Sequence, residues 1–393
     1  MQQTDSPVQD SGQKYGADGR LTFLDVLKGL AIIAVICDHS KCWSLLCPLT
    51  FLPHTVTFYS VTLFILCAGY TSALSLERSK ESSFLWIRRK VVHIFVYYLV
   101  GTIVYLFFET PGHVIYFSKF MDSLINFKAC ITFYFMAFFL QLLFVAPFFY
   151  QIFSSRGGKL HSFFKVLFYL FTLLLSYGCM RYTCIENIGL GGHYLLGGTY
   201  LACYVTGQII CIYRHFFFRK LVNLICLAAS AALLFIFQSR HFNGIPLICN
   251  INPPGMRLIF YAATIFFAIS LLFLFLPKIL SKILSLVSFL GKYSLEIFLY
   301  HLLIMRFFGN YFRFGTGAKE IVICKVLPTW KLFSSRGLVF PDTPALKFLI
   351  GTAAFICYLF VPVLLTMLYR YLRKLLDFYI KPELSRIDIA KKS

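Results

Sequence analysis

Four ionisable side chains lie within or beside one apolar stretch near the start of the chain. Residues 20–40 read RLTFLDVLKGLAIIAVICDHS, and the part from Gly29 to Cys37 contains no charged residue. The four are Asp25, Lys28, Asp38 and His39. An ionisable group at membrane depth costs about 3 kcal/mol on insertion scales, so it is usually retained for a function. Histidine has an ordinary pKa of about 6.5, so it can act as a general base at neutral pH.

The spacing of these residues predicts that two of them share one face of a helix. Lys28 and His39 are eleven residues apart, which corresponds to about 16 Å along a helix axis. Asp25 lies three residues before Lys28 and can pair with it. Asp38 is adjacent to His39 and therefore points elsewhere. The alternative is that Asp25 and Lys28 lie among lipid headgroups, with the lysine snorkelling. The spaced set that ends in His39 favours a functional role.

The composition places the chain in a membrane. Of the 393 residues, 59% are hydrophobic and only 13% are charged, whereas a soluble globular protein has about 25% charged residues. The net charge of +21 would suggest nucleic acid binding in a soluble chain. Here the positive residues can be assigned to loops beside anionic lipid, so membrane lipids are expected as partners and nucleic acid is not. We predict an all-α integral membrane protein.

Apolar stretches that cross a bilayer need about 20 residues. Such stretches lie near 21–39, 53–76, 91–108, 129–153, 163–180, 194–213, 221–238, 257–277, 293–310 and 346–369. The predicted fold is a bundle of about ten transmembrane helices. We expect a disordered polar N-terminal tail (1–19), a transmembrane domain (20–376) and a basic cytoplasmic C-terminal tail (377–393).

The distribution of Lys and Arg predicts the orientation, because cytoplasmic loops carry an excess of these residues. With a cytoplasmic N-terminus, the inner segments hold 23 Lys and Arg and the outer segments 13, of which seven lie in the long loop 306–347. Both termini are therefore predicted to be cytoplasmic, with an even number of spans. This orientation puts Lys28 towards the cytoplasm and His39 in the outer half of the cell (inner or plasma) membrane.

The 13 cysteines include no C-x-x-C pair. This argues against a zinc or thioredoxin-like site, and no metal is predicted. Most of the cysteines are expected to be small apolar fillers. Cys42 and Cys47 lie in a predicted outer loop and could form a disulfide, and the sequence does not decide whether they do.

A basic cluster follows the second predicted span. Arg88, Arg89 and Lys90 stand at its inner side, where an anionic ligand from the cytoplasm would meet them. The positive-inside rule also supplies such residues, so both interpretations stay open. Within the second span, Gly69 is expected to serve close packing rather than chemistry.

Two more ionisable residues interrupt a late apolar stretch. Glu296 and His301 lie in LGKYSLEIFLYHLLIM, residues 290–305, about one and a half helical turns apart. Two ionisable groups in one span indicate a function by default. The alternative is a hydrogen-bonded pair that holds the bundle together, and the sequence does not choose between them.

Four stretches, in order along the chain, resemble motifs of the acyltransferase family 3 membrane proteins. Residues 20–40 resemble the first-helix signature, in which an aspartate, a cation and an apolar run precede a histidine. Residues 61–98 resemble the FFxxSGY motif and the basic segment after it. YFMAFFLQLLFVAP resembles WFLxxLLQLYLLxP, with Tyr134 at the tryptophan position. LGKYSLEIFLYH, residues 290–301, resembles GKxSxxIYxxH.

The resemblance is closest to the fucose 4-O-acetylase-like branch. It implies about ten spans and O-acetylation of a glycan or lipid-linked sugar, with cytoplasmic acetyl-CoA as the co-substrate. It also implies that His39 corresponds to the essential histidine and Lys28 to the basic residue before it. The chain departs from the family in two places. The Arg-x-x-Arg motif is incomplete at 88–93, and Ala68 replaces the usual serine before Gly69.

These roles combine into one hypothesis, in which acetyl-CoA docks at the cytoplasmic face and His39 deprotonates the acceptor hydroxyl. The candidate donor-binding residues are Lys28, Arg88, Arg89 and Lys90. The candidate catalytic residues are His39, Asp25 and Lys28. The candidate residues that line the acceptor pocket or orient the histidine are Asp38, Glu296 and His301. A histidine-acetyl intermediate stays open. A non-enzymatic carrier or exporter of lipid-linked saccharides is the alternative from another class of function.

Overall fold

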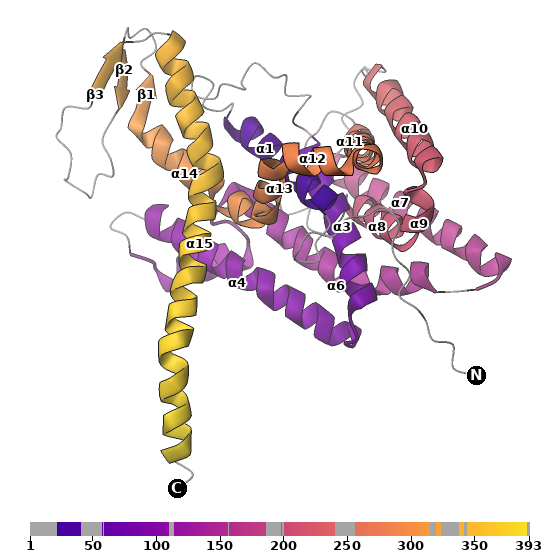
Figure 1. Ribbon diagram of the computed structural model, residues 1–393, viewed down its shortest axis with the longest axis horizontal. Coiled ribbons are helices and arrows are strands. Elements are labelled where there is room, and N and C mark those ends of the chain that lie inside the picture. The colour runs from indigo at the N-terminus through magenta and orange to yellow at the C-terminus, as the bar shows by residue number, and fades with distance from the viewer. Residues whose placement is uncertain are drawn as a thin grey trace. The chain divides into compact units, whose positions relative to one another are not determined.

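The structure is a computed structural model, and it describes residues 22–40, 57, 59–109, 114–155, 157–185, 198, 200–239, 256–314, 320–323, 338–341 and 344–390. Figure 1 shows how these residues form helices and strands. The α-helices are α1 (Thr22–Ser40), α3 (Ser60–Arg78), α4 (Ser83–Glu109), α5 (Phe117–Ile125), α6 (Tyr134–Ser154), α7 (Lys159–Ile185), α8 (Leu201–Ile212), α9 (Arg214–Phe217), α10 (Lys220–Ser239), α11 (Met256–Phe275), α12 (Pro277–Ile283), α13 (Ser285–Lys292), α14 (Ser294–Tyr311) and α15 (Pro344–Ala390). The 3-10 helix η3 (Ile131–Phe133) precedes α6.

The helical character predicted from the sequence is confirmed, since each predicted apolar stretch contains a helix. Among the described residues, five helices are long and apolar enough to cross a membrane. They are Ser60–Arg78, Ser83–Phe108, Tyr134–Ser154, Lys159–Cys179 and Gly351–Tyr371. The number rises to seven if α11 with α12, and α13 with α14, each form one broken span. A helix satisfies its own backbone hydrogen bonds, which is what a segment surrounded by lipid requires.

The described chain forms two compact units. The larger unit comprises the described residues of Met1–Val35 and Pro53–Ser294, and the smaller one those of Ile36–Leu52 and Leu295–Ser393. The first part of α1 therefore belongs to the larger unit and its last turn to the smaller one.

Helix α3 is central to the larger unit, where it packs against α6, α8 and α11. Its contact with α8 is backbone to backbone. A Cβ atom on Gly69 would collide with the carbonyl oxygen of Tyr204, and one on Gly207 with the carbonyl oxygen of Leu66. Small residues at a helix crossing allow this close approach. The expectation that Gly69 serves packing is confirmed.

Polar side chains link the helices of the larger unit. The Tyr204 hydroxyl on α8 donates a hydrogen bond to Ser72 Oγ on α3 (2.7 Å). Gln208 Nε2, also on α8, donates to the carbonyl oxygen of Ala146 on α6 (3.1 Å). Such bonds between apolar helices contribute about 0.6 kcal/mol each. Together with the glycine contacts, these hydrogen bonds fix the position of α3 among its neighbours.

The third predicted span begins earlier than expected. Helix α4 starts at Ser83, whereas the hydropathy placed the span at 91–108. The backbone N–H of Trp86 bonds the Ser82 carbonyl oxygen (3.0 Å), which continues the helical pattern at its start. The basic cluster 88–90 is therefore helical and does not lie in a loop. Hydropathy misses this start because charged residues lower the apolar average without preventing a helix.

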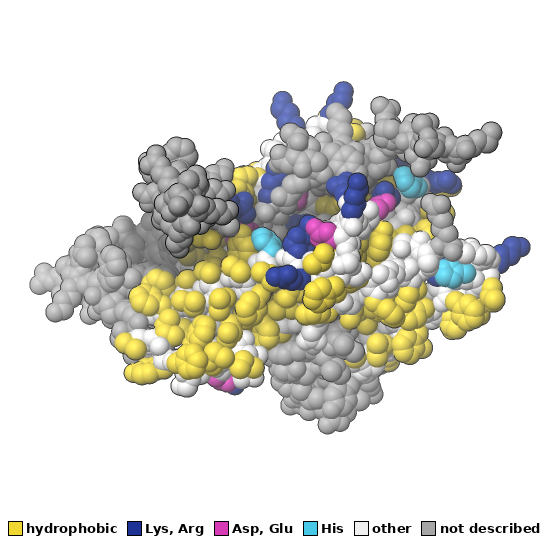
Figure 2. All heavy atoms as spheres, turned by 90° about the horizontal axis from the view of Figure 1, so that it is seen from below, with side chains coloured by type: hydrophobic (Ala, Val, Ile, Leu, Met, Phe, Trp, Pro, Cys, Tyr) yellow, Lys and Arg dark blue, Asp and Glu magenta, His cyan; other side chains and the backbone are white. Residues whose placement is uncertain are grey.

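Large apolar side chains are exposed on the outer surfaces of the larger unit. Figure 2 shows a face on which such side chains form a wide area. Examples on α7 are Leu160, Phe163, Phe164, Phe171 and Leu174. A water-soluble protein rarely exposes so large an apolar area. The protein is therefore a multi-pass membrane protein.

The smaller unit contains the end of α1, α14, α15 and a three-stranded antiparallel sheet. The strands are β1 (Phe312–Phe314), β2 (Glu320–Ile323) and β3 (Leu338–Pro341), in the order β1-β2-β3. Phe312 pairs with Ile323, and Glu320 with Pro341. The strands were not predicted, because hydropathy treats 306–347 only as a long loop. The all-α prediction therefore holds for the helices and needs this one correction.

Some expectations lie outside the described residues. They concern the N-terminal tail 1–19 and the Cys42–Cys47 pair.

Candidate active site

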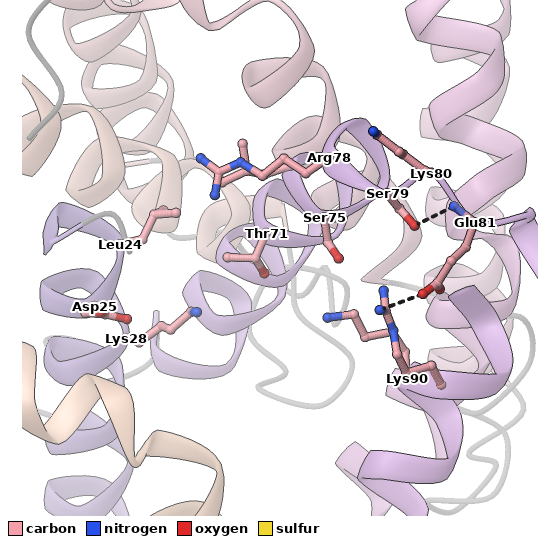
Figure 3. A pocket seen from close by; sticks show the side chains of 12 residues that line it. Leu24, Asp25, Lys28, Thr71, Ser75, Arg78, Ser79, Lys80, Glu81 and Lys90 are labelled. Atoms are coloured by element: carbon pink, nitrogen blue, oxygen red, sulfur yellow. Dashed lines mark hydrogen bonds and ion pairs between the residues drawn. The ribbon is translucent and has the colours of Figure 1, made fainter. Parts of the chain in front are cut away.

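A cavity of about 660 Å³ lies in the larger unit among α1, α3 and the start of α4 (Figure 3). Its lining residues are Leu24, Asp25, Lys28, Thr71, Leu74, Ser75, Arg78, Ser79, Lys80, Glu81, Arg89 and Lys90. Ligand pockets in proteins have volumes of about 300–1,000 Å³, so this cavity can hold a small molecule.

The lining is strongly basic. Its cations are Lys28, Arg78, Lys80, Arg89 and Lys90, and its carboxylates are Asp25 and Glu81. In Figure 3 the amino groups of Lys28 and Lys90 point into the same space from opposite sides. Cations gathered in a low-dielectric hollow create a positive potential that concentrates anionic ligands. The cavity is therefore suited to a ligand with several negative charges.

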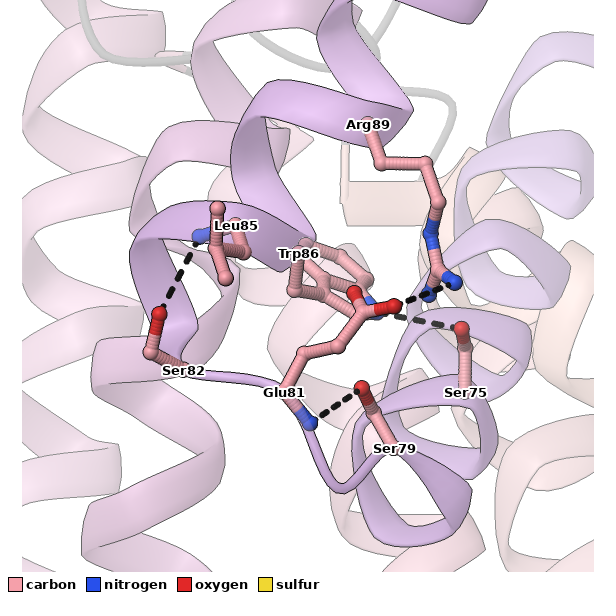
Figure 4. A network of polar contacts seen from close by, with 7 residues as sticks. All are labelled: Ser75, Ser79, Glu81, Ser82, Leu85, Trp86 and Arg89. Atoms are coloured by element: carbon pink, nitrogen blue, oxygen red, sulfur yellow. Dashed lines mark hydrogen bonds and ion pairs between the residues drawn. The ribbon is translucent and has the colours of Figure 1, made fainter.

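A polar network at the end of α3 and the start of α4 shapes one wall of the cavity (Figure 4). Arg89 Nη1 lies 2.9 Å from Glu81 Oε1. The backbone N–H of Glu81 donates to Ser79 Oγ (3.2 Å). Trp86 Nε1 donates to Ser75 Oγ (3.0 Å), which joins α4 to α3. An ion pair as exposed as that of Arg89 and Glu81 contributes less than about 1 kcal/mol to stability, so its main effect is to hold the guanidinium at the cavity.

Lys90 follows Arg89 in the same turn of α4. It is half-buried, and its Nζ atom is 6.0 Å from the ring centroid of the buried Trp86. A cation within about 6 Å of an indole centroid is attracted by the ring. Trp86 thus bonds α3 through its nitrogen and supports Lys90 with its face.

Two glycines hold α13 against the part of α1 that lines the cavity. A Cβ atom on Gly291 would collide with the carbonyl oxygen of Asp25, and one on Gly29 with the carbonyl oxygen of Val287. The contact is reciprocal, since each helix supplies one glycine. The side chain of Asp25 is buried. The glycine of the GKYS segment therefore helps to place the start of α1, a role that the sequence did not reveal.

The structure separates the members of the predicted donor site. Lys28, Arg89 and Lys90 line the cavity, whereas Arg88 is exposed and lies outside the lining. His93, one turn further along α4, is exposed, and its ring contacts that of Tyr97 (centroids 5.2 Å apart).

Sequence reasoning missed several lining residues. They are Thr71, Ser75, Arg78, Ser79, Lys80 and Glu81. In the sequence, Arg78 and Lys80 contribute only to the Lys and Arg excess of the inner segments. That charge excess was the one available signal, and it cannot distinguish a ligand site from a topology signal.

In the smaller unit, the structure brings together two predicted site residues that are far apart in sequence. The ring centroids of His39 on α1 and His301 on α14 are 5.1 Å apart, with an angle of 47° between the ring planes. His39 is half-buried and His301 is fully buried. Asp38 is half-buried beside His39 in the sequence. A pair of imidazoles at this distance can share or relay a proton.

Glu296 has a different partner. Its Oε1 atom lies 2.9 Å from Arg370 Nη2 on α15, and only 5% of the Glu296 side chain is exposed. The contact joins α14 to α15 within the smaller unit. The structure thus gives the buried carboxylate an ion pair, while His301 contacts His39.

One comparison with known proteins finds a match. A family model described as an acyltransferase domain, that of acyltransferase family 3, matches residues 21–335. No curated protein and no solved structure matches the chain. The matched range includes the cavity of the larger unit and both histidines of the smaller one. Since the match covers most of the 393 residues, the chain belongs to acyltransferase family 3 and is a membrane acyltransferase.

Proposed function

We propose that the protein moves an acetyl group from cytoplasmic acetyl-CoA to a hydroxyl group of a cell-surface glycan or lipid-linked sugar. The observation that carries this proposal is the basic cavity, since it includes Lys28 on α1, the same unbroken helix that carries His39. The family match argues against the carrier or exporter, because a carrier needs no acyltransferase domain.

The cavity is the proposed donor site. Coenzyme A carries several phosphate charges at one end, and Lys and Arg bind phosphate oxygens through charge-assisted hydrogen bonds. The lining cations are the five named above. Thr71 and Ser75 add hydroxyl groups to the same wall. The proposed ligand therefore matches the cavity in charge.

The reacting end of the donor would extend along α1. Lys28 and His39 are eleven residues apart in this helix, or about 16 Å along its axis, a length comparable to that of an extended pantetheine arm. His39 then takes the proton of the acceptor hydroxyl group, and the oxygen of that hydroxyl group bonds the acetyl carbon. The carbon–sulfur bond breaks, and the imidazolium returns the proton to the departing thiolate. Transfer through a histidine-acetyl intermediate would use the same residues.

The finer features of the proposal rest on sequence motifs and loop charge. The resemblance to the fucose 4-O-acetylase-like branch supports a sugar hydroxyl as acceptor. The ten apolar stretches support about ten spans in the inner or plasma membrane. The excess of Lys and Arg in the inner segments supports an orientation with both termini cytoplasmic. In this arrangement 20–376 is the catalytic membrane domain and 377–393 a basic cytoplasmic tail.

Substitution of His39 by Ala tests the proposal. Membranes that contain the protein are incubated with radiolabelled acetyl-CoA, and label in the saccharide fraction is counted. The loss of a general base lowers a rate about 10²- to 10⁴-fold, so His39→Ala is expected to lose at least about 10²-fold. His215→Ala, at an exposed histidine on α9, is the control and is expected to retain the wild-type rate. Wild-type transfer by an equally expressed His39→Ala variant would contradict the proposal.

A further inference from the structure

We propose that His301 is a positioning residue for His39, holding the base in the tautomer that proton transfer needs. This inference rests on the proposed function, since it assigns a partner to the proposed base. The observations that carry it are the hydrogen bonds of His301, its burial and its distance from His39.

The backbone determines the tautomer of His301. Its Nδ1 atom lies 2.8 Å from the carbonyl oxygen of Phe298 and 3.1 Å from that of Ile297. A carbonyl oxygen only accepts, so Nδ1 carries the hydrogen. In a neutral imidazole, Nε2 is then an acceptor with a free lone pair.

The environment of His301 favours the neutral ring. The residue has no exposed surface, and Ile297 and Leu299 beside it are also fully buried. A charged ring at such a place needs an anionic partner. In the part of the chain that the structure describes, the nearby carboxylate of Glu296 is bonded to Arg370 instead.

The Nε2 atom of His301 is buried, and it has no hydrogen-bond partner among the described residues. A buried polar atom without a partner is uncommon and requires an explanation. The half-buried His39 is the neighbouring ring that can supply a donor.

The distance between the rings fits a hydrogen bond. Each imidazole nitrogen lies about 1.2 Å from its ring centroid, so a linear N–H···N bond of about 2.9 Å joins rings whose centroids are about 5.3 Å apart. The centroids of His39 and His301 are 5.1 Å apart. In the proposed state, the His39 ring is turned so that one of its N–H groups is directed at His301 Nε2.

This bond would assign separate roles to the two nitrogens of His39. One nitrogen donates to His301 and keeps its hydrogen, so the other has a lone pair and accepts the proton of the acceptor hydroxyl. The hydroxyl oxygen bonds the acetyl carbon, the carbon–sulfur bond breaks, and the proton passes from His39 to the thiolate. His301 gains no proton over the cycle. It stabilises the transient imidazolium of His39 by accepting its hydrogen bond.

Two substitutions of His301 separate a hydrogen-bond acceptor from a space-filling ring. Gln places a polar atom close to the position of Nε2, whereas Phe keeps the ring and removes the acceptor. His215→Phe is the matched control. The assay measures the maximal rate of label transfer from acetyl-CoA to the membrane saccharide fraction, and the acetyl-CoA concentration that gives half of it.

We expect His301→Phe to lower the maximal rate by about 10- to 100-fold, the order found when the hydrogen-bond partner of a metal-binding histidine is removed. The half-maximal acetyl-CoA concentration is expected to change less than about twofold, because the donor cavity is untouched. His301→Gln should recover most of the rate. Equal losses in the Gln and Phe variants, or a wild-type rate in the Phe variant, would overturn the inference. Absence of transfer by the wild-type protein would instead reject the proposed function.

A second measurement does not depend on the folding of the Phe variant. The wild-type protein is labelled with ¹⁵N-histidine in lipid nanodiscs, and the His301 signals are assigned by their loss in His301→Gln. The inference requires a protonated Nδ1 and an unprotonated Nε2 at neutral pH. A protonated Nε2 at His301 would overturn it.

Discussion

Arg88 and Arg89 are adjacent in the sequence, but their side chains have different surroundings. Arg89 bonds Glu81 and lines the basic cavity, whereas Arg88 is exposed outside the lining. The difference arises because successive residues on a helix point about 100° apart. The cavity therefore takes cations from more than one element, since Arg78 at the end of α3 and Lys80 just after it join Arg89 in the lining.

Substitution of Arg89 by Gln is expected to raise the KM for acetyl-CoA about tenfold. The change lowers the net charge of the lining by one and leaves the Glu81 carboxylate without its partner at the cavity, where it repels an anionic donor. Arg88→Gln is the matched comparison and is expected to change KM less than about threefold. Initial rates of label transfer at varied acetyl-CoA concentration provide the measurement. A larger effect at Arg88 than at Arg89 would contradict the placement of the donor.

At the scale of elements, the site depends on two helix crossings with glycines on both sides. Gly69 and Gly207 bring α3 against α8, and Gly29 and Gly291 bring α1 against α13. The first crossing supports the α3 wall of the cavity, and the second supports the α1 wall. Glycine is needed at these positions because a Cβ atom would occupy the place of a backbone carbonyl oxygen, which cannot move away as a flexible side chain can.

Substitution of Gly291 by Ala is expected to destabilise the protein by about 1–3 kcal/mol, the usual cost of overpacking. Its Cβ atom would collide with the backbone of Asp25. Gly178→Ala, in α7, is the control because nothing lies within 4 Å of its added Cβ. Alanine there is expected to be neutral or slightly stabilising. Thermal unfolding in detergent measures both, and equal unfolding temperatures for the two variants would argue against the close crossing.

The pair formed by Glu296 and Arg370 gives a second prediction at this scale. Arg370→Leu leaves a carboxylate that is 95% buried without its cation, so it should destabilise the protein by about 2 kcal/mol. This is less than the 3–5 kcal/mol of a fully buried pair, because 51% of the Arg370 side chain is exposed. The double variant Glu296→Gln/Arg370→Leu should recover part of the loss. Strictly additive effects in this double-mutant cycle would show that the pair is not coupled.

For the whole molecule, the balance of charge and apolar surface determines how the chain lies in a membrane. Exposed apolar side chains cover the outer surfaces of α4, α7 and α10. In the proposed orientation, the excess of Lys and Arg lies on the cytoplasmic side. In the proposed orientation, the basic cavity opens towards the cytoplasm, where coenzyme A is found. Topology and donor chemistry therefore support each other.

Epitope tags test this orientation. Tags at the N- and C-termini are expected to bind antibody only after the cells are permeabilised, because both termini are proposed to be cytoplasmic. A tag inserted before Val114, in the segment between α4 and α5, should be accessible on intact cells or spheroplasts. Detection of the C-terminal tag on the outside would mean an odd number of spans and would contradict the proposal.

Much of the architecture followed from local properties of the sequence. Apolar runs of sufficient length predicted the helices, and the ordered motifs pointed to acyltransferase family 3, which the family match confirms. His39 and Lys28 are candidate site residues because a charged group is costly in an apolar stretch. Hydropathy did not locate the start of α4 at Ser83 or the strands β1 to β3, because an apolar average contains no information on helix propensity or strand pairing.

Only the tertiary structure showed which distant residues come together. His39 and His301 are 262 positions apart in the sequence, and their contact depends on the packing of α14 within the smaller unit. Arg78 and Lys80 join the cavity only because α3 ends beside the start of α4, and Gly291 matters only because α13 crosses α1. The sequence alone shows which ionisable residues lie in apolar stretches, since their cost is local. Their partners were decided by helix packing, which depends on contacts between segments far apart in the chain.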